Sequence, residues 1–112
     1  MQIAEHKIGD KLVLEVLETR LGADKAVAFK DAVSHYLAHG PVSMVLDLGR
    51  VEFIDSSGLG AILGVLKRMP KGSELLICRA SDAVTSMFKL TRMDRVFTIC
   101  KTVDEAVAVR SH

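Results

Sequence analysis

Three consecutive polar residues, Asp55, Ser56 and Ser57, directly precede an apolar segment whose spacing predicts a helix. The first backbone N–H groups of a helix lack internal partners, so a carboxylate or a hydroxyl at this position accepts hydrogen bonds from them. The same end of a helix also favours negative charge, including phosphate. Two compatible interpretations follow: one of these residues caps the helix, and one of the serines is a site of phosphorylation.

A phosphate on this segment would change its surface charge more than its fold. Phosphoserine carries about −1.5 to −2 charges at pH 7 and would lie beside Asp55. Like-charge repulsion and the cost of desolvation would oppose a partner that docks flat on this surface, whereas the helix N-terminus would offset the charge within the fold. The segment is therefore predicted to control protein docking through its charge.

Three glycines follow, at Gly58, Gly60 and Gly64. Their spacing, G-x-G-x-x-x-G, is one residue too long for the dinucleotide-binding fingerprint, which makes a nucleotide-binding loop the weaker interpretation. Gly60 and Gly64 lie four residues apart on one helical face, where each costs about 1 kcal/mol in helix propensity. We expect them to let the helix approach the sheet or another helix closely, and to flatten the exposed surface beside Ser56.

Other groups that could do chemistry are weaker candidates. His35 and His39 are four residues apart in a predicted helix, but no third metal ligand is evident, and a solvated pair is the favoured interpretation. The G-x-S-x-G motif of serine hydrolases is absent from the sequence. The sequence thus predicts a protein that is not an enzyme and that uses no cofactor and no metal.

The 112 residues carry 15 basic and 14 acidic side chains, for a net charge of +1, and 49% of them are hydrophobic. This length and composition fit one folded domain covering residues 1–112. Nucleic-acid-binding domains are usually markedly basic, so nucleic acid is not an expected partner. No apolar run approaches the roughly 20 residues that span a bilayer, and the first residues lack the pattern of a secretory signal.

The two cysteines, Cys78 and Cys100, each lie in or at the end of an apolar run. We expect two buried thiols in neighbouring strands, because free cysteine is among the most buried residue types; a redox or metal role is the minor alternative. A small secreted scaffold usually carries four or more cysteines. This usage favours the reducing cytoplasm as the location.

Apolar periodicity predicts strands that alternate with helices. The expected strands are 2–7, 11–17, 42–48, 74–78 and 96–100, and the expected helices are 23–39, 57–69, 81–90 and 102–109. The turn signal Gly9-Asp10 indicates that 2–7 is a strand and forms a hairpin with 11–17. Ser81 is the expected cap of the third helix, and residues 102–105 match a capping box. The order predicts an α/β fold with a mixed or largely parallel sheet, in which functional groups gather in loops at the carboxyl ends of strands. Here that loop is 49–55, where we expect Phe53 and Ile54 to anchor the chain in the core.

The string D-S-S-G-L-G-A-I-L-G at residues 55–64 resembles the phosphorylation segment of STAS domains, as found in bacterial anti-sigma factor antagonists. The resemblance extends over essentially the whole chain. Residues 45–48 resemble the strand before the motif, 75–84 the next strand and helix, and 104–106 the start of the last helix. It implies a single domain with a mixed sheet of four to five strands and about four helices packed mainly on one face.

The resemblance also implies a partner switch. In the family, the unmodified antagonist binds an anti-sigma factor that is also a serine kinase of the GHKL ATPase type, and a sigma factor is thereby released. Phosphorylation breaks this complex, and a PP2C-type phosphatase restores it. The acceptor in the family is the hydroxyl residue directly after the aspartate, which is Ser56 here; Asp55 is then the neighbouring carboxylate and Ser57 the helix cap. The family also suggests a monomer in isolation.

The partner-binding surface implied by the resemblance has two parts. The first is the motif itself, with Asp55, Ser56, Ser57, Gly58, Leu59 and Gly60. The second is the end of the second strand, where many antagonists have the sequence G-x-L-D. This chain departs from that pattern with T-R-L-G, so the expected contacts there are Thr19, Leu21 and Gly22.

Two alternatives keep the fold but change the role. One is the STAS subunit of a lipid-transport ABC complex, which would pack on the ATPase and need no kinase. The other is a partner switch whose output is secretion, motility or biofilm formation. Proteins that co-purify with the chain discriminate between them, because an ATPase with a permease favours the transporter and a GHKL kinase favours a switch.

Overall fold

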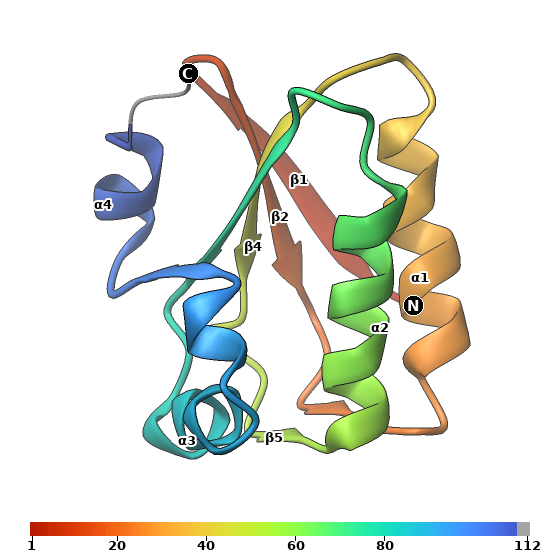
Figure 1. The fold of residues 1–112 in the computed structure, drawn as a ribbon, viewed down its shortest axis with the longest axis vertical. Coiled ribbons are helices and arrows are strands. Elements are labelled where there is room, and N and C mark those ends of the chain that lie inside the picture. Colours follow the sequence, from red (N-terminus) through yellow and green to blue (C-terminus); the bar gives the residue numbers. More distant parts are fainter. Residues whose placement is uncertain (110–112) are drawn as a thin grey trace.

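The computed structural model describes residues 1–109, which form an α/β fold around one five-stranded sheet (Figure 1). The strand order is β1-β2-β4-β6-β7. The strands are β1 (Ile3–Ile8), β2 (Lys11–Val16), β4 (Ser43–Asp47), β6 (Glu74–Cys78) and β7 (Thr98–Cys100). β1 and β2 form an antiparallel hairpin, whereas β2, β4, β6 and β7 run parallel. The predicted mixed sheet and its initial hairpin are confirmed.

The helices cover the two faces of this sheet unequally, as expected. Helices α1 (Ala26–Ser34), α2 (Ser56–Arg68) and α3 (Asp82–Leu90) contribute to the larger core on one face, and α4 (Val103–Val107) packs on the other. Within residues 1–109, no helix is long and apolar enough to cross a membrane.

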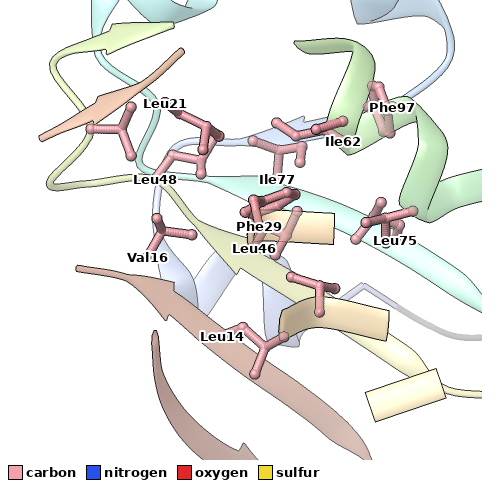
Figure 2. Packing of buried hydrophobic residues seen from close by; sticks show 14 of the residues in the cluster. Leu14, Val16, Leu21, Phe29, Leu46, Leu48, Ile62, Leu75, Ile77 and Phe97 are labelled. Atoms are coloured by element: carbon pink, nitrogen blue, oxygen red, sulfur yellow. The ribbon is translucent and has the colours of Figure 1, made fainter. Parts of the chain in front are cut away.

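The larger core fixes the positions of α1 and α2 over the sheet. It includes Leu14, Phe29, Leu46, Ile62 and Ile77, whose side chains meet between the helices and the central strands (Figure 2). Along each strand, alternate residues point to opposite faces, so the next residues enter a second cluster. That cluster contains Val13, Val45 and Leu76 and is covered by Ala106 of α4. Both faces of β4 are therefore buried, which explains its nearly continuous apolar sequence.

Two 3₁₀ turns shift the expected boundaries. The first helix starts later than predicted, at Ala26, and its last part is the turn η1 (His35–Leu37). A second turn, η2 (Met93–Arg95), precedes β7, and the Phe97 N–H donates to the Met93 carbonyl at 3.0 Å. The strand predicted at 96–100 therefore begins only at Thr98. The caps predicted at Ser81 and Thr102 are confirmed, since their side chains accept from the N–H groups of Val84 and Glu105.

Two short strands, β3 (Arg20–Leu21) and β5 (Phe53–Ile54), form a separate parallel pair that the sequence did not predict. Ile54 enters the core as expected, but Phe53 is 40% exposed, so the expectation that it anchors the loop there is wrong. Adjacent strand residues point in opposite directions, and the Phe53 ring instead lies under the Arg20 guanidinium, 4.3 Å from the ring centroid.

The two cysteines are register partners on neighbouring strands, as predicted. Cys78 on β6 lies opposite Cys100 on β7, and both are buried. Burial raises the pKa of Cys78 to about 12 and also raises the pKa of Cys100. The thiolate is the reactive form of cysteine, so neither side chain is activated at neutral pH.

Candidate functional site

The start of α2 lies at the carboxyl edge of the parallel strands, beside the short pair β3 and β5 (Figure 1). Ser56 is the first residue of the helix, and both Ser56 and Ser57 are exposed. The Ser56 hydroxyl is therefore within reach of a modifying enzyme. Had the residue been buried, no kinase could use it without unfolding this part of the protein.

The loop that leads to Ser56 is fixed where it leaves β4. Asp47 is buried, and its Oδ1 accepts from the Gly49 N–H at 2.9 Å. Arg79, which follows β6, donates from Nη1 to Asp47 Oδ2 at 3.1 Å. The buried carboxylate is thus both hydrogen-bonded and paired with a cation, as a buried charge requires. This contact ties the first turn of the loop to the neighbouring strand.

Asp55, rather than Ser57, caps α2. The Asp55 backbone is extended, and its Oδ1 accepts from the Gly58 N–H at 2.9 Å. The prediction that Ser57 is the cap is therefore wrong. A carboxylate at this position also gains from the positive end of the helix dipole. The capping role falls to Asp55, which leaves Ser56 as an accessible hydroxyl on the first turn.

The same carboxylate joins two segments that are far apart in the sequence. Asp55 Oδ2 accepts from the Ala23 N–H at 3.1 Å, and the Asp55 N–H donates to the Leu21 carbonyl at 3.4 Å. A methyl group at Gly22 would lie only 3.1 Å from Asp55 Oδ2. The absence of a side chain at Gly22 therefore leaves room for the Asp55 carboxylate next to the Ala23 N–H. Asp55 therefore brings together the two parts of the surface that the sequence analysis assigned to partner binding.

The hydrogen bonds to Asp55 lower its pKa, with the largest contribution from the Gly58 N–H. Asp55→Ala is expected to lower the urea midpoint at pH 7, because it removes both the helix cap and the link to Ala23. The ionised carboxylate stabilises the fold above its unfolded pKa of about 3.9, and this contribution is lost as the pH falls through the lower folded value. The difference from wild type should therefore shrink in acid. The matched control is Asp31→Ala, at an exposed position of α1, and an equal effect of the two variants would contradict this role.

The nine expected contact residues divide into accessible and buried ones. Thr19, Ser56, Ser57 and Gly60 are exposed, and Asp55 is partly exposed. Leu21, Gly22, Gly58 and Leu59 are buried, and the side chains of Leu21 and Leu59 belong to the core. The four buried residues support the surface, and the five accessible residues are the ones that a partner can contact.

Gly58, and not Gly60, is the glycine that permits a close approach. A methyl group at Gly58 would lie 2.0 Å from the Leu21 carbonyl oxygen, whereas one at Gly60 would meet nothing within 4 Å. The expectation of a close-packed Gly60 is therefore wrong. A methyl group at Gly64 would lie 3.1 Å from a side-chain carbon of Lys30 on α1. The open space at Gly60 agrees with the other expectation, that small residues flatten the surface beside Ser56.

A shallow groove of about 250 Å³ between α1 and α2 continues this surface. It is lined by Val27 and Lys30 from α1 and by Ser57 and Gly60 from α2. Val27 is 71% exposed, and sequence reasoning did not select it. The sequence feature that could have identified Val27 is an apolar residue that lies outside the buried stripe of its helix. Val27 adds apolar surface to the groove beside the small residues Ser57 and Gly60.

Charged side chains border the loop before α1. Lys25 donates a hydrogen bond to Glu18, which raises the pKa of Lys25 and lowers the pKa of Glu18. Sequence reasoning missed this pair, which depends on how the chain folds on either side of β3. It also missed the stacking of Arg20 on Phe53, which depends on how β3 lies beside β5. These contacts hold the loop that carries Thr19 in place next to α2.

A family model described as STAS domain matches residues 7–106. The chain belongs to the STAS domain family. A Thermotoga maritima relative named "Putative anti-sigma factor antagonist" is 32% identical over 104 residues, which cover 91% of this chain and 92% of the relative. A crystal structure of a Thermotoga maritima protein with the same description has a TM-score of 0.82 and 29% identity, and covers 94% of this chain and 91% of that chain.

Two solved structures of lower sequence identity show a likeness in fold alone. The anti-sigma factor antagonist SpoIIAA in its unphosphorylated form has a TM-score of 0.75 and 18% identity, over 95% of this chain and 93% of that chain. SpoIIAA from Bacillus has also been solved in a phosphorylated form, with a TM-score of 0.68 and 17% identity, over 95% of this chain and 96% of that chain. The predicted membership of the STAS family is confirmed by the family match, and the predicted fold by the Thermotoga maritima structure.

Proposed function

We propose that this STAS domain is an anti-sigma factor antagonist whose binding is controlled by phosphorylation of Ser56. The proposal is carried by the exposed Ser56 hydroxyl on the first turn of α2, next to the capping carboxylate of Asp55. The antagonist names of the relatives support this role. One of these proteins, SpoIIAA, has been solved both with and without phosphate.

The physical basis of the switch is the charge that a phosphate adds to a small, weakly polar surface. Without phosphate, a partner meets the hydroxyls of Ser56 and Ser57, the bare backbone at Gly60 and the apolar Val27. With phosphate, about −1.5 to −2 charges stand beside the ionised Asp55. A docked partner would have to desolvate both anions, so binding weakens while the helix N-terminus keeps the fold intact.

The proposed partner is an anti-sigma factor that is also a serine kinase of the GHKL ATPase type. In the kinase reaction, the Ser56 hydroxyl oxygen forms a bond to the γ-phosphorus of ATP, the bond to the ADP oxygen breaks, and the hydroxyl proton leaves to a base. A PP2C-type phosphatase reverses the state by hydrolysis, which returns serine and releases inorganic phosphate. The chain supplies only the acceptor hydroxyl, in keeping with a regulatory protein in the cytoplasm.

The test combines the protein with ATP and the GHKL-type kinase recovered from its own cells by pull-down. Ser56→Ala is expected to remove essentially all incorporated phosphate, and Ser57→Ala, the matched control on the same turn, is expected to keep it. Mass spectrometry of tryptic peptides locates the modified residue. Stoichiometric phosphate on Ser56→Ala would overturn the assignment.

A binding measurement tests the electrostatic part of the proposal. Ser56→Asp and the phosphorylated protein are expected to bind the kinase more weakly than wild type by roughly tenfold or more, because they place a second anion next to Asp55. Isothermal titration calorimetry with the kinase gives the affinities. Unchanged affinity would contradict the charge mechanism. Recovery of an ATPase with a permease, instead of a kinase, would replace the proposal with the lipid-transport alternative.

A further inference from the structure

Strand β1 is an unprotected edge of the sheet. Among residues 1–109, β1 pairs only with β2, and the Leu17 N–H donates to the Gln2 carbonyl at 2.9 Å. Hydrogen-bonded and non-hydrogen-bonded pairs alternate along an antiparallel ladder. Counting from Gln2, the backbone groups of Ala4 and His6 therefore point to β2. The backbone N–H and C=O groups of the residues between and next to these two point away from the sheet and can bond to another strand.

The outward-pointing backbone groups belong to Ile3, Glu5 and Lys7. An added antiparallel strand must align its own outward-pointing groups with these. A second copy of β1 does so when His6 of one chain lies opposite His6 of the other, because Glu5 of each chain then faces Lys7 of the other. Each such pair exchanges two main-chain hydrogen bonds and joins opposite charges.

Other registers of the same strand are worse. Centring the pair on Glu5 or on Lys7 places like charges directly opposite each other, which is destabilising. A shift by one residue would set outward-pointing groups against groups already bonded to β2. The pattern Glu5-His6-Lys7 therefore selects one self-complementary register.

The side chains on the two faces of β1 fit this register as well. On the face shared with Val13, Ala4 of one chain would meet Ile8 of the other, and Ile8 is 41% exposed in the single chain. On the opposite face, a groove of about 790 Å³ runs beside Glu5 and Lys7 and includes Tyr36 among its lining residues. The Tyr36 hydroxyl lies 3.5 Å from Glu5 Oε1. The groove leaves the helix-side surface around Glu5 and Lys7 uncovered, so both side chains are accessible.

We propose that β1 is a homodimer interface, in which two copies of the chain join edge to edge into one continuous ten-stranded sheet. The two-fold axis is normal to the sheet, so the α1 and α2 layers of both copies lie on the same side. Because the joined strands are antiparallel, the two Ser56 sites lie at opposite ends of the assembly and both stay accessible. The proposal replaces the monomer suggested by the family and does not depend on the phosphorylation switch.

Sedimentation equilibrium from micromolar to millimolar protein tests the interface. Wild type is expected to show a reversible transition from 12.2 kDa to twice that mass. Glu5→Lys and Lys7→Glu are each expected to weaken the dimer roughly tenfold, because each sets like charges opposite each other. The double variant Glu5→Lys/Lys7→Glu restores the complementarity, and an equimolar mixture of the two single variants forms a heterodimer. Far-UV circular dichroism confirms that each variant is folded.

The matched control is Lys71→Glu, a charge reversal on an exposed loop residue, which should leave the dimer unchanged. Wild type that stays at the monomer mass at millimolar concentration would overturn the proposal; the charges on β1 would then serve only to prevent edge-to-edge aggregation. A dimer that is insensitive to both single charge reversals would place the interface elsewhere and would equally overturn it.

Discussion

Gly58→Ala is expected to destabilise the protein by about 3 kcal/mol and to distort the segment that presents Ser56. The added methyl group would lie 2.0 Å from the Leu21 carbonyl oxygen and 3.1 Å from a side-chain carbon of Ile54. The first of these contacts is with backbone, which cannot rotate away as a flexible side chain would. The α2 start and β3 must therefore separate, which weakens the hydrogen bond between the Asp55 N–H and Leu21.

Thermal and urea denaturation measure this effect, with a drop in Tm of roughly 10–15 °C expected for a domain of this size. Gly60→Ala is a matched control only two residues away. It places the same methyl group in open space within the same helix, where alanine is favoured over glycine by about 1 kcal/mol. Gly58→Ala should therefore lower the stability of the protein, whereas Gly60→Ala should raise it. Equal stabilities of the two variants would show that α2 does not pack against β3 as described.

The comparison of these glycines shows what local sequence patterns predict and what they do not. Apolar periodicity located the later four strands of the main sheet and the four helices, because each pattern repeats over several residues, and a turn signal at Gly9-Asp10 located the first strand. The Ser81 cap was also predictable, since its partner lies three residues away. The difference between Gly58 and Gly60 depends on the position of Leu21, which is distant in the sequence and close only in the fold.

The sequence predicted where the candidate site lies, but it did not predict which of its residues caps the helix. The sequence placed three polar residues at the start of α2, and Ser56 proved to be accessible. The choice of Asp55 over Ser57 as the cap is set by the path of the loop, which the Ala23 N–H and the Leu21 carbonyl fix from another segment. Two-residue strands such as β3 and β5 carry no periodicity, so the contacts that they create were not predictable.

The sequence also did not predict a network around a buried lysine at the amino ends of the parallel strands. Lys11, Ser43 and Glu74 are the first residues of β2, β4 and β6, and they align only once the register is known. Lys11 is 1% exposed, and its Nζ lies 3.2 Å from both Ser43 Oγ and Glu74 Oε1. The Ser43 hydroxyl also donates to Glu74 Oε1 at 2.7 Å. This network joins three parallel strands at their amino ends.

Lys11→Ala is expected to destabilise the protein by about 3 kcal/mol, because removing one partner of a buried ion pair leaves the other uncompensated and also leaves a cavity. This value lies at the lower end of the usual range, since Glu74 is 26% exposed and keeps its bond to Ser43. Lys11→Met retains the apolar stem and should cost less. Urea denaturation at pH 7 measures both, and Lys71→Ala on an exposed loop is the control, expected within about 0.5 kcal/mol of wild type.

The same variants separate stability from the proposed function, because the Lys11 network and Ser56 lie at opposite ends of the parallel strands. At a temperature well below its melting transition, Lys11→Ala should accept phosphate from the GHKL-type kinase at the wild-type rate, whereas Gly58→Ala should accept it more slowly even when fully folded. Under the proposed function, phosphate transfer depends on the local geometry at the start of α2, which Gly58→Ala alters and Lys11→Ala does not. Equal loss of phosphate transfer in both variants would mean that global stability, and not the geometry around Ser56, limits the reaction.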